Sequence, residues 1–97
     1  MKSINLYSAV FAIDSWHHAN NVHCPNVCTY GPYIEDLDYI LDMLMNNVKA
    51  YGLSNEHGMI TRESIIEEMN KNKFDTRIFF DKPREGYLII MKDSILV

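Results

Sequence analysis

The residues whose types could support chemistry are concentrated between positions 14 and 33. This segment holds three of the four histidines, both cysteines and the only tryptophan. Zinc takes thiolate and imidazole ligands in tetrahedral sites, and the spacing of the two cysteines lies within the range seen in such sites. One interpretation of the segment is therefore a zinc-stabilised binding module, as an alternative to the function proposed below from the rest of the chain. Its ligands would be His18, His23, Cys24 and Cys28.

The same segment allows two other interpretations. Its cysteines can be small buried apolar groups, with the histidines solvated or hydrogen-bonded to the backbone. Alternatively, it contains the residue types of a nucleophile, a base and an orienting acid. Those candidates are Asp14, Ser15, His17, His18 and Cys24. No nucleophile-elbow glycines, phosphate loop or dinucleotide fingerprint is present, so we predict no enzyme activity.

The segment has neither the period of a helix nor that of a strand. Asparagines, prolines and a glycine interrupt it, so we expect residues 14–33 to form a long irregular loop. Loops of this length in compact domains are usually functional or mobile. Three aromatic residues of the loop are candidate interface anchors. They are Trp16, Tyr30 and Tyr33.

The clearest structural signal follows this loop. Apolar residues recur at helical spacing, which predicts a helix over 34–50 with one buried stripe. Gly52 is placed to end this helix. The stripe consists of Ile34, Leu37, Ile40, Leu41, Leu44 and Val48.

The opposite side of this helix is acidic. Glu35, Asp38 and Asp42 follow one another at the spacing of neighbours on a helix. Such a row is typical of a solvated face, and acids near a helix N-terminus also favour the helix dipole. It also suits docking, because a negative field steers a basic partner. We interpret the row, together with the three loop aromatics, as a binding surface for a basic or nucleic-acid-binding protein.

The remaining elements complete an α+β fold. Residues 3–13 are apolar on both faces, which is typical of a strand inside a sheet. Thr61 is a candidate N-cap for a helix over 61–71. Strands over 76–81 and 87–92 flank a turn and predict a hairpin. The order predicts one domain with a three-stranded, mainly antiparallel sheet and two helices packed on one face.

Charge is divided unevenly along the chain. The formal net charge of −4 argues against direct nucleic-acid binding. Residues 1–69 carry nine acids against three basic residues, whereas residues 70–97 carry four acids against six. A helix followed by a hairpin with Lys82 and Arg84 at its tip resembles half of a winged-helix domain, over residues 60–92. The resemblance implies a wing that reaches the DNA backbone, although the acids of the helix would repel phosphate.

Together, these patterns predict a small cytoplasmic interaction protein, an inhibitor or adaptor that binds a protein partner. No apolar run approaches the roughly 20 residues of a membrane helix, and two cysteines without an export signal favour a reducing compartment. No cofactor is expected, with zinc as the open alternative, and a homodimer is a second open alternative. Residue usage rich in asparagine, isoleucine and lysine fits an AT-rich genome, for example that of a phage.

Overall fold

The computed structural model describes residues 2–17, 22–72 and 75–96. It contains two helices, a four-stranded antiparallel sheet and a separate two-stranded hairpin. The predicted α+β class, with two helices and an antiparallel sheet, is confirmed. The predicted number of strands in the sheet is wrong, because the sheet has four strands instead of three.

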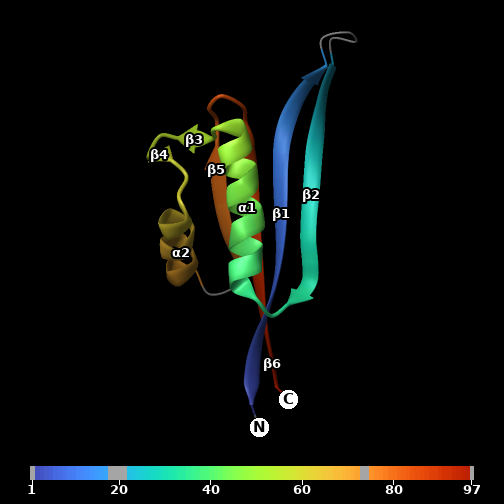
Figure 1. Cartoon of the computed structure of the whole chain (residues 1–97), viewed down its shortest axis with the longest axis vertical. Coiled ribbons are helices and arrows are strands. Elements are labelled where there is room, and N and C mark those ends of the chain that lie inside the picture. The colour runs from blue at the N-terminus through green and yellow to red at the C-terminus, as the bar shows by residue number, and fades with distance from the viewer. Residues whose placement is uncertain (1, 18–21, 73–74, 97) are drawn as a thin grey trace.

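The main sheet has the strand order β2-β1-β6-β5 (Figure 1). β1 lies in the interior, as its two apolar faces predict. It pairs with β6, a choice that the sequence left open, and the C-terminal apolar residues extend β6 along the start of β1. The strands are β1 Ser3–His17, β2 Val22–Ile34, β5 Asp75–Phe80 and β6 Gly86–Leu96.

The prediction of an irregular loop over 14–33 is wrong. Residues 14–17 form the end of β1 and residues 22–33 form almost all of β2, with continuous pairing from Ala9 opposite Tyr30 up to His17 opposite Val22. Residues 18–21 of the predicted loop lie outside the described part of the chain. Pro25 and Pro32 are compatible with this strand because β2 is at the edge of the sheet, where an amide donor has no strand to bind. The hairpin extends beyond the helices as a two-stranded ribbon (Figure 1).

Helix α1 spans Leu37–Tyr51 and begins later than predicted. Asp36 is its N-cap and accepts a hydrogen bond from the Tyr39 amide at 3.3 Å. Gly52 ends the helix in the left-handed conformation, with φ 62°, as its position predicts. The buried part of the apolar stripe consists of Ile40, Leu41, Leu44 and Val48, whereas Ile34 belongs to β2.

Helix α2 spans Arg62–Lys71 and begins at Thr61, the predicted N-cap. Thr61 and Ser64 form a capping box, in which each side chain accepts a hydrogen bond from the backbone amide of the other.

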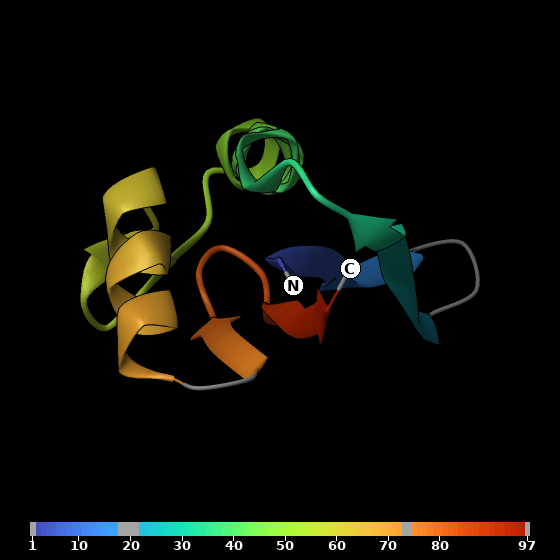
Figure 2. The same ribbon diagram turned by 90° about the horizontal axis from the view of Figure 1, so that it is seen from below.

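Between the helices, β3 (Ser54–Asn55) and β4 (Gly58–Met59) form a short hairpin. Figure 2 shows α1 over one face of the sheet and α2 beside the edge strand β5.

The sheet therefore has a covered face and an open face. Alternate residues of the strands point toward the helices and form the core with α1. The residues between them point the other way, and no part of the described chain lies over that face (Figure 2). The covered face is built from Ala9, Phe11, Ile13, Ile78, Phe80, Leu88 and Ile90.

Candidate functional site

Of the histidine- and cysteine-rich segment, His17 lies on β1, and His23, Cys24 and Cys28 lie on β2. Trp16 is opposite His23 in the strand pairing. Cys24 and Cys28 lie four positions apart on β2, which separates their backbones by about 13 Å along an extended strand. Zinc–sulfur bonds are about 2.3 Å long, so this strand does not bring the two thiolates to one ion.

The zinc and hydrolytic predictions both include His18, which lies outside the described residues. Among the residues that the structure describes, no group of three or more His, Cys, Asp or Glu could hold a metal ion. In the hydrolytic set, Asp14, Ser15 and His17 lie along β1, and Cys24 is opposite Ser15 on β2. Both predictions stay untested, and a zinc site with these ligands would require the hairpin to depart from its strand pairing.

The acidic row of α1 has a partner inside the protein. Arg62, the first residue of α2, donates from Nη2 to Asp38 Oδ1 at 2.7 Å and from Nη1 to Asp42 Oδ1 at 2.6 Å. The hydrogen bond to Asp42, followed by that to Asp38, raises the pKa of Arg62 above its ordinary value. We call this arrangement the Arg62 clamp. Glu35 lies before the helix cap, exposed and outside the clamp.

The Arg62 clamp leads to a prediction about stability. We expect Arg62→Gln to lower the melting temperature slightly. Arg62→Lys should lower it less, because lysine keeps the charge but lacks the two guanidinium nitrogens that bind two carboxylates at once. Thermal unfolding at low and high salt measures this effect. The difference from the parent protein should shrink as salt increases, since the ion pairs are exposed. A difference that is independent of salt would show that Arg62 acts through packing.

One of the three loop aromatics makes a contact inside the protein. Tyr30 is half-buried, and its hydroxyl accepts a hydrogen bond from Asn47 Nδ2 of α1 at 2.6 Å. This contact joins β2 to the helix, so Tyr30 has a structural role. Trp16 and Tyr33 are placed on β1 and β2 by their backbones. Among the residues whose exposure is described, the exposed aromatic side chains are Tyr39, Tyr51, Phe79 and Tyr87.

Lys82 and Arg84, the candidate wing residues, contact other elements of the protein. The guanidinium of Arg84 lies over the Tyr51 ring at the end of α1, 5.6 Å from its centroid. Lys82 pairs with Ser54 of β3 through backbone hydrogen bonds. Because β6 is also an interior strand of the sheet, the β5–β6 hairpin is not a free-standing wing.

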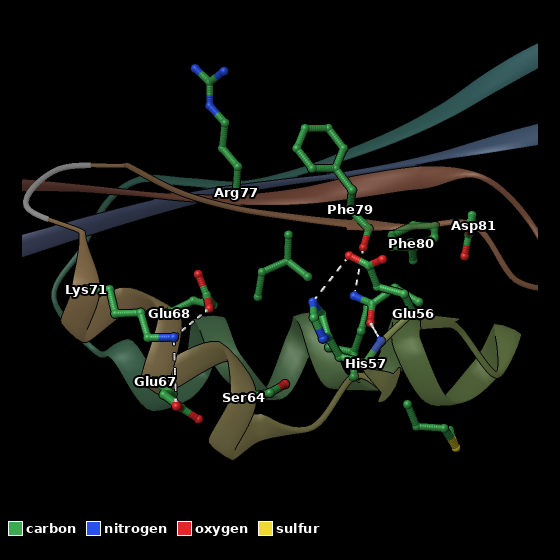
Figure 3. Close-up of a pocket in the computed structure, with 14 residues that line it drawn as sticks. Glu56, His57, Ser64, Glu67, Glu68, Lys71, Arg77, Phe79, Phe80 and Asp81 are labelled. Carbon is green, nitrogen blue, oxygen red and sulfur yellow. Dashed lines mark hydrogen bonds and ion pairs between the residues drawn. The ribbon is translucent and has the colours of Figure 1, made fainter.

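A groove of about 850 Å³ lies between α2 and the outer edge of β5 (Figure 3). On the α2 side, Lys71 Nζ is 3.3 Å from Glu68 and 3.9 Å from Glu67. On the β5 side, Asn55 Nδ2 donates to the Phe79 carbonyl at 2.9 Å. These contacts pair some of the polar groups of the rim with one another.

The groove also contains a serine and a histidine, but they do not form a nucleophile and base. Ser64 Oγ donates to the Thr61 carbonyl at 2.8 Å as part of the helix cap. The His57 imidazole lies 3.4 Å from Glu56 and is 83% exposed. The described groove residues therefore supply no activated nucleophile.

The open face of the sheet has an apolar centre, which was not predicted as a site from the sequence. Phe79 is 64% exposed and Val27 is 56% exposed. The Phe79 ring is 6.2 Å from that of Tyr87 on the neighbouring strand. The apolar residues on both faces of residues 3–13 were the signal that could have revealed it. Contiguous exposed apolar surface of this kind usually marks an interaction site.

Comparisons of the chain with protein-family models, with curated proteins and with solved structures found no match. Neither described helix has the length and apolar character that crossing a membrane requires. The candidate functional surfaces are the outer side of α1 and α2, the groove and the open face.

Proposed function

We propose that the protein is a binding protein, an inhibitor or adaptor, that docks a basic partner protein on the outer surface of its helices. The observation that carries the proposal is the charge of residues 35–71, which we call the helical layer. These residues include eight acids and three basic residues, whereas the rest of the chain has five acids and six basic residues. Such a division creates a field that steers a positive partner toward the helices.

Two of the three basic residues of the helical layer are already paired within it. Arg62 binds Asp38 and Asp42, and Lys71 lies beside two glutamates of α2. The side chains of these paired acids are nevertheless between 43% and 81% exposed. The layer therefore keeps a surplus of accessible negative charge.

The helical layer also offers exposed apolar groups among its acids. Tyr39 of α1 is 46% exposed and Ile66 of α2 is 38% exposed. Interfaces combine a few apolar anchors with a polar rim, and tyrosine is enriched among the residues that dominate binding. In this proposal Tyr39 takes the anchoring role that the sequence analysis assigned to Tyr30, because Tyr30 bonds to Asn47 instead.

The experiment must change charge without breaking the Arg62 clamp. Reversal of Asp38 or Asp42 would leave Arg62 facing a lysine and would confuse binding with stability. The variant of choice is Glu35→Lys combined with Glu63→Lys, because both residues are exposed and lie outside the clamp. Its matched control is Asp81→Lys with Glu85→Lys, which makes the same charge change outside the helical layer.

Affinity capture from a lysate of the source cell, followed by binding measurements with the captured protein, distinguishes the outcomes. The parent and the control should retain the same basic partner, and the helical-layer variant should lose it. The association rate should fall with salt, because charges on exposed surfaces are screened beyond about 8–10 Å at physiological ionic strength. A helical-layer variant that retains every partner of the parent would refute the proposal.

A further inference from the structure

We infer that the open face of the sheet binds a second copy of this chain, giving a two-fold symmetric dimer with the sheets packed face to face. The open face lies on the side of the sheet away from α1 (Figure 2). It shares no residue with the helical layer, so this inference is independent of the proposed function.

The open face is organised in rows that cross all four strands. In the first row Phe79 pairs with Tyr87, Tyr87 with Ala12, and Ala12 with Val27. The aromatic half of the row is on β5 and β6, and the half with small side chains is on β1 and β2. Ala12 is only 4% exposed, and a hollow of about 670 Å³ is lined by all four residues together with the acids Asp14, Asp81 and Glu85.

The second row has an apolar centre and polar ends. Ile89 and Val10 pair on the interior strands β6 and β1 and are half-buried by their neighbours. Arg77 and Thr29 occupy the same row on the edge strands β5 and β2, and both are exposed. An apolar centre with a polar rim is the usual anatomy of a protein–protein interface.

The arrangement of the first row is complementary to itself. A two-fold axis parallel to the strands, midway between β1 and β6, places β5 over β2 of the second copy and β6 over β1. Phe79 then faces Val27 of the second copy, and Tyr87 faces Ala12. Each bulky pair meets a small pair, as an interface between identical surfaces requires. Packed sheets keep their strands aligned to within about 30°.

The size of the open face suits a reversible dimer. A third row on the same side consists of Asp75, Met91 and Ser8. Four strands about 4.8 Å apart and three rows about 6.8 Å apart cover roughly 400 Å² in each copy. The accessible area of the corrugated side chains exceeds this footprint, so both copies together bury on the order of 1,000 Å². Interfaces of this size belong to weak and transient complexes. We therefore expect a dissociation constant in the micromolar range.

The symmetry of the dimer permits a rescue experiment. Phe79→Glu and Val27→Lys each place a charge against an apolar side chain at both contacts of the dimer. Each variant alone should associate roughly tenfold or more weakly than the parent, because an unpaired charge resists burial. In an equimolar mixture, one contact pairs the new carboxylate with the new ammonium, and the other keeps phenylalanine against valine. Sedimentation velocity should therefore show the dimer again in the mixture.

The controls keep this experiment independent of folding. Both substituted residues are exposed, so circular dichroism of each variant should match that of the parent. Ile66→Glu changes an exposed apolar residue of α2, outside the open face, and should leave dimerisation unchanged. The inference is overturned by a parent protein that stays monomeric up to its solubility limit. It is also overturned by a dimer that survives both single variants, or by a mixture that stays monomeric.

Discussion

Replacing Phe11 by alanine should lower the free energy of unfolding by about 3–5 kcal/mol, the range for removing a buried aromatic ring. Phe11 is 2% exposed in the middle of β1. Its ring stacks on Phe80 of β5 at 5.7 Å and on Tyr51 of α1 at 6.2 Å. The substitution would leave a cavity where the sheet meets the end of the helix, so both layers would lose packing.

Phe79→Ala is the matched control for this prediction. It removes the same ring from the same sheet, but from the open face, where Phe79 is 64% exposed. At protein concentrations too low for dimerisation, we expect a change within about 1 kcal/mol. Urea unfolding followed by circular dichroism measures both variants. Equal losses for Phe11→Ala and Phe79→Ala would mean that the covered and open faces are assigned incorrectly.

Leu44→Ala should cost about 2–5 kcal/mol of a total stability of about 5–15 kcal/mol. Leu44 is fully buried on α1 and belongs to the core cluster that joins the helix to the sheet. Ile40→Ala should behave similarly, because Ile40 is also fully buried. Leu37 is only partly buried at the first turn, so Leu37→Ala should cost less than either.

Tyr39→Ala tests whether the loss depends on burial or on helix formation. Tyr39 lies on the same helix but is 46% exposed, so its removal should change the free energy of unfolding much less. The same urea titrations provide the measurement. If Leu44→Ala unfolded at the same urea concentration as Tyr39→Ala, the apolar stripe of α1 would not be the contact with the sheet.

The two helices could be predicted from the sequence because their signals are local. The stripe of α1 repeats with the helical period, and Gly52 ends the helix with contacts to Val48 and Lys49 in its last turn. The start of α2 is likewise determined by Thr61 and its neighbour Ser64. Interactions between residues three or four positions apart depend little on the rest of the chain.

The second strand could not be predicted in this way. The prolines and the glycine of β2 are typical of loops, and only the position of the strand at the edge of the sheet makes them acceptable. That position depends on pairing with β1, in which Val10 lies opposite Thr29 and Phe11 opposite Cys28. The partner residues are 17 to 19 positions apart in the chain, so local composition does not report the pairing.

The candidate surfaces likewise depend partly on local spacing and partly on contacts between distant residues. The sequence by itself determined that acids line one side of α1, because their spacing is that of neighbours on a helix. Only the tertiary structure decided that Arg62, 20 residues after Asp42, binds two of them. It also decided which side of the sheet is left open, because a strand with two apolar faces does not specify which face a distant helix will cover.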